Sequence, residues 1–258
     1  MSGLLSTLKK TVPRRARDVL LPFAYFEKGR RFRPTHTDVK ERACNQPFLM
    51  ADNPLESYFK SHTIGRGIWK WNHYFKIYDR HLRKFRGRKV NILEIGIYSG
   101  GSLDMWRSYF GEGATIYGVD IEPSCTAYES DHIKIFIGDQ GSRDFWLDFK
   151  SRAPAMDIVI DDGSHRHGDQ IVSMEEMLPS LSRGGVYLCE DVHGVGNRYA
   201  AFVYGLADQL NGLTTPTNAT QASIESVCLY PFVAVIEKTE GHVSEFTFEK
   251  RGTEWQPF

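Results

Sequence analysis

The sequence lacks a long hydrophobic run and a dense set of cysteines. The longest apolar stretch near its start, residues 19–26, is interrupted by Pro22 and followed by basic residues. It matches neither a membrane span of about 20 residues nor a secretory signal. The four cysteines lie far apart, without a C-x-x-C motif, at positions 44, 125, 189 and 228. We therefore expect free thiols, a cytoplasmic location and no transmembrane segment.

The chain also lacks net charge, with 32 Lys and Arg against 32 Asp and Glu in 258 residues. The charges are unevenly distributed, because residues 1–90 hold 21 basic and 7 acidic residues and the remainder holds 11 and 25. A basic segment of this kind can contact nucleic acid, an acidic membrane surface or a phosphorylated ligand. No RNA-reading motif is present, which argues against nucleic acid. Packing against the acidic half of the same chain or of a twin subunit is the simpler alternative and leaves a homo-oligomer open.

The first 50 residues show no sustained periodicity and contain four prolines. Helical spacing of apolar residues begins at 55–62 and continues at 72–85. We predict a basic N-terminal arm or lid over residues 1–70, followed by one domain over residues 71–258. The length suits one large α/β domain with an extension.

From residue 90 onward, short β-rich runs alternate with helical patterns. The runs are 90–96, 115–120, 132–139, 156–162 and 185–191, and the helices between them begin near Ser102, Ser142, Gly168 and Gly194. We expect the first two serines to act as N-caps. Continuous apolar strands alternating with helices predict a parallel sheet covered on both faces. Two closing strands, 225–238 and 244–250, have no helix between them and must be antiparallel. The predicted fold is a doubly wound, mostly parallel seven-stranded sheet of the Rossmann-like methyltransferase type, with an antiparallel last strand and a helical N-terminal extension.

Ligands of such sheets bind at the carboxyl ends of the strands. The first predicted strand ends in a glycine-rich turn that departs from the nicotinamide fingerprint, because the second glycine of that pattern falls at Tyr98. An acidic residue before the turn, Glu94, suits a ligand with positive charge. Asp120, at the end of the second strand, is placed to accept the hydroxyls of a ribose, and Asp139 and Gln140 form a polar tip near an adenine edge.

Acidic residues end the fourth and fifth predicted strands. Asp161, Asp162 and His165 follow the fourth, and Glu190 and Asp191 follow the fifth. Tips of neighbouring strands lie about 5 Å apart, so these carboxylates converge and repel one another unless a cation sits between them. Oxygen ligands favour Mg²⁺, with Mn²⁺ or Ca²⁺ as alternatives, and a histidine ligand would shift the preference toward a transition metal. The simpler alternative is that Asp161 caps the next helix and the others face water.

The segments LEIGIYSGGSLDMW, GVDIE, GDQ, IDDGSH and GGVYLCEDVH carry a family likeness. They resemble the S-adenosylmethionine-dependent, Mg²⁺-dependent O-methyltransferases that act on macrolide sugars, and the related cephalosporin hydroxylase-type proteins. The likeness covers residues 74–194. It implies a metal held by Asp162, Glu190 and Asp191, with His165 and Asp162 as catalytic residues and His165 as the general base. The cofactor residues it implies are Glu94, Gly96, Tyr98, Ser99, Gly101, Ser102, Asp120, Ile121, Asp139, Gln140 and Asp161.

The resemblance implies methyl transfer from S-adenosylmethionine to a hydroxyl of a sugar, a sugar-containing natural product or a polysaccharide. The acceptor would be a small molecule or glycan with vicinal hydroxyls that chelate the metal. Three alternatives stay open: transfer to a catechol-like aromatic, a nicotinamide-dependent oxidoreductase, and a nucleoside- or RNA-binding protein without catalysis. Trp69, Trp71, His73 and Tyr74 precede the domain, where they either close over a ligand or pack an entry helix.

Overall fold

A computed structural model describes most of the chain, namely residues 22–23, 25–31, 53–212 and 218–252. Its contacts define two compact units, residues 1–50 and residues 51–258. In the smaller unit, residues 22–23 and 25–30 are helical, and Arg30 pairs with Glu27 at 2.8 Å. The predicted boundary at residue 70 falls within the larger unit, where Leu55 and Lys70 are both buried.

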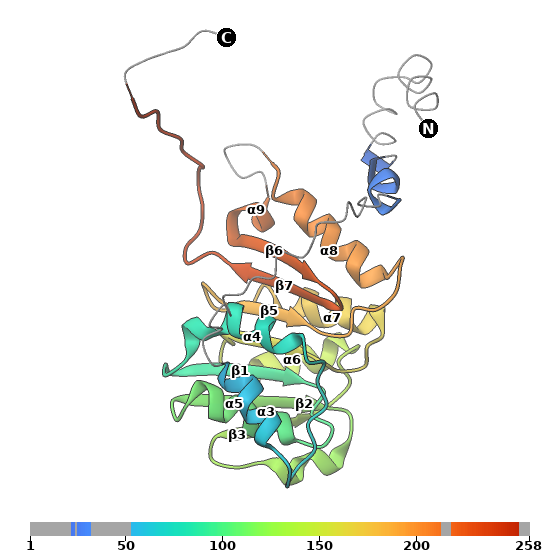
Figure 1. Cartoon of the computed structure of the whole chain (residues 1–258), viewed down its shortest axis with the longest axis vertical. Helices are drawn as coiled ribbons and strands as arrows, with labels where there is room; N and C mark the ends of the chain where they lie inside the picture. Colours follow the sequence, from blue (N-terminus) through green and yellow to red (C-terminus); the bar gives the residue numbers. More distant parts are fainter. Residues whose placement is uncertain (1–21, 24, 32–52, 213–217, 253–258) are drawn as a thin grey trace, which may run out of the picture. The chain divides into compact units, whose positions relative to one another are not determined.

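One mixed sheet of seven strands forms the centre of the larger unit (Figure 1). Its order is β3-β2-β1-β4-β5-β7-β6, and β7 runs antiparallel to both of its neighbours while β1 to β5 are parallel. The strands are β1 (Val90–Ile95), β2 (Ala114–Asp120), β3 (Ile133–Ile137), β4 (Ile158–Asp161), β5 (Val186–Cys189), β6 (Ile224–Tyr230) and β7 (Val233–Lys238). The predicted fold class is confirmed. Strand order reverses between β1 and β4, which places the expected ligand crevice at their carboxyl ends.

The two antiparallel strands differ from the prediction. The stretch 225–238, expected to be one strand, contains both β6 and β7, joined by a tight turn at Pro231 and Phe232. Phe232 has a φ of 65°, the left-handed conformation that such a turn needs. The apolar run around the turn hides it from a periodicity argument. The predicted strand 244–250 forms no strand.

Helices cover both faces of the sheet, and each face has its own hydrophobic core. On one face, α3 (Pro54–Ser61), α4 (Tyr74–Leu82), the 3₁₀ turn η1 (Arg83–Phe85) and α5 (Gly101–Phe110) pack against alternate strand residues. The other face is covered by α6 (Arg143–Arg152), α7 (His167–Met177) and α8 (Arg198–Gln209). Two short elements, the 3₁₀ helix η2 (Pro123–Tyr128) and α9 (Ala219–Ser223), complete the unit. Because the strands are buried on both sides, they read as continuous apolar runs.

Helix starts follow from local capping chemistry. Ser142 caps α6 as predicted, accepting a hydrogen bond from the backbone of Phe145 at 3.3 Å. Ser102 does not cap α5, because the N-cap is Gly100 in a left-handed conformation and the serine lies within the first turn. The last predicted helix begins later than Gly194, at Arg198, since Asn197 provides its cap.

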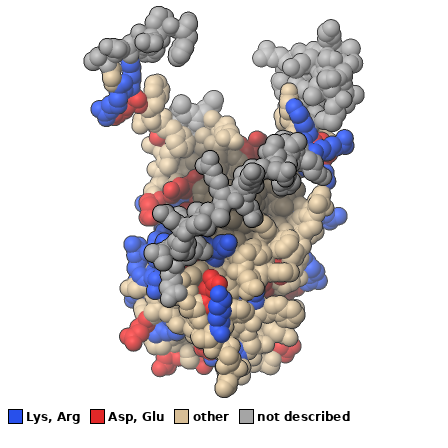
Figure 2. All heavy atoms as spheres, viewed as in Figure 1, with Lys and Arg blue, Asp and Glu red and all other residues tan. Residues whose placement is uncertain are grey.

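Charges of the basic and acidic halves intermix within the larger unit. Arg66 pairs with Asp104 and Lys84 with Glu237, at 2.7 and 3.9 Å. On the face drawn in Figure 2, blue and red side chains alternate over the described surface instead of separating into two regions. Packing of basic residues onto the acidic half of the same chain is thus seen for these pairs. Within the described residues, no helix is long and apolar enough to cross a membrane.

Candidate active site

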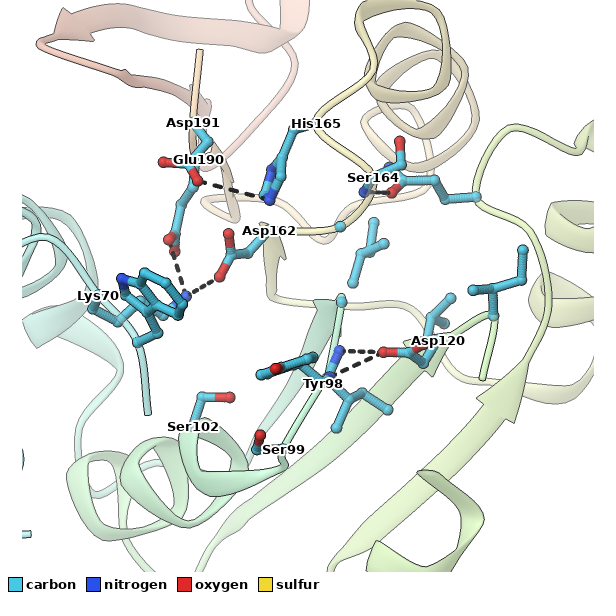
Figure 3. A pocket seen from close by; sticks show the side chains of 18 of the residues that line it. Lys70, Tyr98, Ser99, Ser102, Asp120, Asp162, Ser164, His165, Glu190 and Asp191 are labelled. Atoms are coloured by element: carbon cyan, nitrogen blue, oxygen red, sulfur yellow. Dashed lines mark hydrogen bonds and ion pairs between the residues drawn. The ribbon is translucent and has the colours of Figure 1, made fainter. Parts of the chain in front are cut away.

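A cavity of about 650 Å³ opens at the carboxyl ends of the central parallel strands (Figure 3). Its walls come from the loops after β1 to β5 and from the segment 67–74, which precedes α4. Most of the predicted site residues line it: Gly96, Tyr98, Ser99, Ser102, Asp120, Ile121, Asp139, Gln140, Asp162, His165, Glu190 and Asp191. The parallel arrangement brings them together because all these strands end at the same edge of the sheet.

The turn after β1 lies against backbone and cannot accommodate a side chain at Gly96. A Cβ there would lie 2.2 Å from the carbonyl oxygen of Asp162, and the residue has a φ of 87°. Asp120 holds the turn from the neighbouring strand, since one of its carboxylate oxygens accepts the backbone N–H groups of Ile97 and Tyr98 at 2.8 and 3.0 Å. The Tyr98 side chain is 78% exposed at the mouth of the cavity. Asp120 therefore shapes the loop in addition to facing the cavity.

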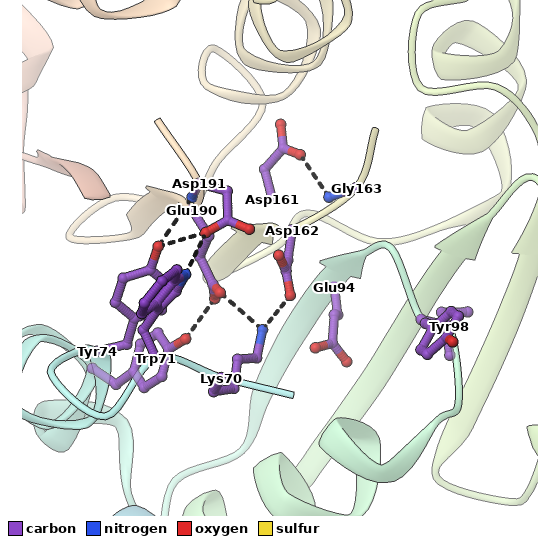
Figure 4. A network of polar contacts seen from close by, with 12 residues as sticks. Lys70, Trp71, Tyr74, Glu94, Tyr98, Asp161, Asp162, Gly163, Glu190 and Asp191 are labelled. Atoms are coloured by element: carbon purple, nitrogen blue, oxygen red, sulfur yellow. Dashed lines mark hydrogen bonds and ion pairs between the residues drawn. The ribbon is translucent and has the colours of Figure 1, made fainter. Parts of the chain in front are cut away.

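Three residues predicted to contact the cofactor lie outside the cavity lining. Glu94 is fully buried, and its Oε1 accepts a hydrogen bond from Trp106 at 3.0 Å. Asp161, also fully buried, accepts hydrogen bonds from Gln140 and Tyr187 at 3.0 Å each. Figure 4 shows its carboxylate turned away from the acidic cluster. Strand alternation explains this, because adjacent residues such as Asp161 and Asp162 point to opposite sides.

Gly101 also lies behind the cavity lining. A Cβ at this position would lie 2.5 Å from the carbonyl oxygen of Gly67. The glycine therefore allows the backbone of the 67–74 segment to lie directly on the first turn of α5. In this structure Gly101 serves the close packing of that segment, and its contact with a cofactor stays a prediction.

Burial changes the acidity of the carboxyl groups behind the cavity. Desolvation raises the pKa of Glu94 to about 7, although the charge of Lys70 acts in the opposite direction. Desolvation likewise raises the pKa of Asp161 to about 7, against its hydrogen bonds from Gln140 and Tyr187. The Oε2 atom of Glu94 has no hydrogen-bond partner among the described residues. Both groups are thus poised to carry a proton near neutral pH.

The predicted acidic cluster is present, but the protein itself supplies a cation within it. Lys70 Nζ lies 2.5 Å from Asp162 Oδ2 and 2.9 Å from Glu190 Oε2 (Figures 3 and 4). The Lys70 side chain is 3% exposed. Burial alone lowers the pKa of Lys70, but the charges of Asp162 and Glu190 outweigh it and the net shift is upward. Tyr78 completes the contacts of Glu190 by donating to Oε1 at 2.7 Å.

Lys70 is the member of the acidic cluster that was not predicted from the sequence. The repulsion between converging carboxylates predicts a positive group, which a lysine can supply as well as a metal. The signal in the sequence was a lysine between Trp69 and Trp71, in the stretch expected either to close over a ligand or to pack an entry helix. Its separation from Asp162 by 92 positions hides the pair from any local motif.

Asp191 connects the entry segment to the acidic cluster. Its Oδ1 accepts hydrogen bonds from Tyr74 at 2.7 Å and from Trp71 at 3.2 Å, and it lies 3.2 Å from His193 Nε2. Its Oδ2 lies 3.7 Å from His165 Nε2. Trp71 and Tyr74 both line the cavity, and Tyr74 is also buried in α4.

The residues present fit a divalent cation. Asp162, His165 and Asp191 each offer a ligand atom, and these atoms lie within 4.8 Å of one another. The two carboxylates suit Mg²⁺ or Mn²⁺, and the imidazole shifts the preference from Mg²⁺ toward a transition metal such as Mn²⁺. Glu190, the third predicted metal ligand, is instead occupied by Lys70 and Tyr78 in this structure.

Strained backbone marks the rim of the cavity. Among the described residues, four that are not glycine have a positive φ: Tyr98, His165, Asp191 and Phe232, at 49°, 55°, 53° and 65°. The first three line the cavity, and Phe232 packs against the rings of Trp71 and His193. Residues in this conformation cost free energy and persist where the surrounding structure requires them, most often at functional sites.

The sheet order and the cavity define a Rossmann-like methyltransferase fold with an acidic, histidine-containing site at its carboxyl edge. No protein-family model matches the chain. The chain is 40% identical over 147 residues to demethylmacrocin O-methyltransferase of Streptomyces fradiae, covering 54% of this chain and 36% of that protein. It is 39% identical over 122 residues to mycinamicin VI 2''-O-methyltransferase of Micromonospora griseorubida, covering 45% and 30%. The chain thus matches about a third of the length of these relatives.

A solved structure supports the same likeness over a longer stretch. The MycE methyltransferase of the mycinamycin pathway, in complex with Mg, SAH and mycinamycin VI, aligns with a TM-score of 0.60 and 28% identity. The alignment covers 74% of this chain and 55% of that one. The resemblance to macrolide-sugar O-methyltransferases expected from the motifs is confirmed by these relatives.

Proposed function

We propose that this chain is a metal-dependent O-methyltransferase that uses S-adenosylmethionine to methylate a hydroxyl of a sugar or a sugar-containing natural product or polysaccharide. One observation carries the proposal: a single cavity combines the glycine turn held by Asp120 with the cluster of Asp162, His165 and Asp191. The similarity to sugar O-methyltransferases of Streptomyces fradiae and Micromonospora griseorubida supports the acceptor class.

The chain's own residues divide the work between two ends of the cavity. The Gly96 turn, Tyr98 and Asp120 would bind the donor at one end. At the other end Asp162 and Asp191 would hold the metal, joined by Glu190 once Lys70 releases it, which leaves His165 free to act on the acceptor. When bound, the metal supplies Lewis acidity that lowers the pKa of an acceptor hydroxyl, and S-adenosylmethionine supplies the methyl group. Vicinal hydroxyls on the acceptor would give two adjacent oxygens for chelation.

His165 is the proposed general base. Its Nε2 faces the cavity beside Asp191 Oδ2, so it can take the proton of an acceptor hydroxyl while the carboxylate stabilises the resulting imidazolium. A positioned base of this kind typically contributes about 10² to 10⁴ in rate. The side chain is 45% exposed, which leaves a path for the proton to solvent.

The test uses the purified full chain, S-adenosylmethionine, Mg²⁺ and a panel of rhamnosylated and other deoxysugar-bearing polyketides, with methylated product detected by mass spectrometry. We expect turnover that EDTA abolishes and that His165→Gln lowers by about 10² or more. His132→Gln is the matched control, because this exposed histidine lies away from the cavity lining. Calorimetric titration with S-adenosylhomocysteine should show binding to both variants.

Two results would contradict the proposal. Full turnover in EDTA would remove the metal from the reaction, and failure of the wild-type chain to bind S-adenosylhomocysteine would remove the donor. Unchanged turnover of His165→Gln would instead reassign the base while leaving the reaction in place.

We also propose a cytoplasmic location, supported by the free thiols of the described Cys125, Cys189 and Cys228.

A further inference from the structure

We propose that Lys70 is a built-in competitor for the metal: its ammonium occupies the carboxylates of Asp162 and Glu190, and a divalent ion displaces it when it binds. The inference rests on the proposed function. It adds a residue that determines metal affinity and links metal binding to the position of the entry segment 67–74.

Both carboxylate oxygens of Glu190 already accept hydrogen bonds in this structure. Its Oε2 accepts from Lys70 at 2.9 Å and its Oε1 from Tyr78 at 2.7 Å, and the side chain is 1% exposed. Asp162 Oδ2 is also taken by Lys70. A metal that takes Asp162 Oδ2 or Glu190 Oε2 therefore requires Lys70 to give up that partner.

Charge balance explains why a lysine would be built into a metal site. Carboxylates that converge in a buried site repel one another strongly, and a buried carboxylate without a partner is costly. With Lys70 in place, the cluster is compensated before the metal arrives. The same ammonium then opposes a second cation, because both need the same oxygen atoms.

The position of Lys70 is fixed by the segment that carries it. On its N-terminal side, Arg66 forms two hydrogen bonds with Asp104 at 2.7 and 2.9 Å, and Gly67 lies on the backbone of Gly101. On its C-terminal side, the Trp71 indole donates to Asp191 at 3.2 Å. Release of Lys70 would therefore also move the neighbouring Trp71, which donates a hydrogen bond to Asp191, a predicted metal ligand.

The first experiment compares Mn²⁺ binding by calorimetry in wild-type protein, Lys70→Met and the control Lys76→Met. Methionine keeps the apolar stem and removes the charge. We expect Lys70→Met to bind Mn²⁺ roughly tenfold more tightly, because a unit charge a few ångströms away interacts strongly even at an effective dielectric of about 20. Lys76 is exposed on α4 and does not line the cavity, so its removal should change the affinity less than twofold.

The second experiment needs no variant and covers the case in which Lys70→Met does not fold. Wild-type protein is labelled with an amine-reactive acetyl ester with and without Mn²⁺, and each lysine is quantified by mass spectrometry. Without metal, we expect Lys70 to react much more slowly than Lys76. With metal, labelling of Lys70 should increase severalfold while that of Lys76 stays constant.

Each other outcome overturns the inference. Equal or weaker Mn²⁺ binding by Lys70→Met, or labelling of Lys70 that does not increase with metal, would show that the ammonium and the metal do not compete. In that case the proposed function stands if wild-type protein still binds Mn²⁺. If neither protein binds Mn²⁺ but both bind S-adenosylhomocysteine, the metal dependence of the proposed function fails together with this inference.

Discussion

Replacement of Glu94 by glutamine should change how stability depends on pH. Glu94 is fully buried at the end of β1, and burial raises its pKa to about 7 from the ordinary value of 4.5. A carboxyl group with a raised pKa stabilises the folded state fully below the unfolded pKa, and this contribution is lost as pH rises through the folded pKa. The window therefore runs from about pH 4.5 to about pH 7.

The magnitude follows from the shift. At 1.36 kcal/mol per pKa unit, the contribution lost across the window is at most about 3 kcal/mol. Glutamine has no proton to lose, so the free energy of unfolding of Glu94→Gln should lack this component. Urea unfolding at pH 5.0 and pH 7.5, with EDTA present, would measure it. The difference in unfolding free energy, wild type minus variant, should be smaller at pH 7.5 than at pH 5.0.

The matched control is Glu112→Gln, an exposed carboxylate in the turn after α5. Its unfolding free energy should follow that of the wild type at both pH values. Parallel pH curves for wild type and Glu94→Gln would refute the reasoning, because Glu94 would then titrate in the folded protein as it does in the unfolded chain. The remaining pH dependence of both proteins would include Asp161, whose pKa is raised in the same way.

Two further substitutions test a buried contact behind the cavity and the turn that lines it. Tyr78→Phe removes the hydrogen bond to the buried Glu190. Because a buried acceptor is then left without its donor, the free energy of unfolding should fall by about 1–3 kcal/mol in urea titrations. A change below about 0.5 kcal/mol would mean that Lys70 alone satisfies this carboxylate. Gly96→Ala places a Cβ 2.2 Å from a backbone oxygen and should weaken S-adenosylhomocysteine binding at least tenfold by calorimetry, whereas Gly168→Ala, with open space around it, should not. Unchanged affinity in Gly96→Ala would show that the turn does not shape the donor site.

Much of the sheet and of the cavity edge can be predicted from the sequence, because strand ends are local features. The run VNILEIG predicts β1 and the turn after it, and the acidic pair at Asp161 and Asp162 marks the end of β4. In a parallel sheet these ends meet at one edge whatever the details of packing. Strand order then brings residues from five strands into one cavity.

The errors arise where neighbouring chain segments decide the outcome. Asp161 reads as a site residue beside Asp162, but strand alternation turns it toward Gln140 and Tyr187. Lys70 reads as one basic residue among many, because its carboxylate partners lie 92 and 120 positions away. Only the three-dimensional arrangement shows that Lys70 is buried beside two carboxylates.

The last strands of the sheet are harder to predict for a different reason. The tight turn at Pro231 and Phe232 interrupts an apolar run without a glycine or asparagine to mark it. The alternation in residues 244–250 is typical of a strand, yet Phe248 is 92% exposed and the segment pairs with no strand among the described residues. Alternation predicts the conformation that a segment can adopt, whereas pairing depends on a partner edge.

The positive φ values of Tyr98, His165, Asp191 and Phe232 have a consequence for engineering. A left-handed conformation costs about 1–2 kcal/mol per residue with a Cβ. Together these four positions therefore lower the free energy of unfolding by several kcal/mol, a large part of the usual stability of a folded domain. A screen for higher thermal stability should therefore select glycine at these positions. Such variants would survive heating better and would have lost the side chains that give the rim its chemistry.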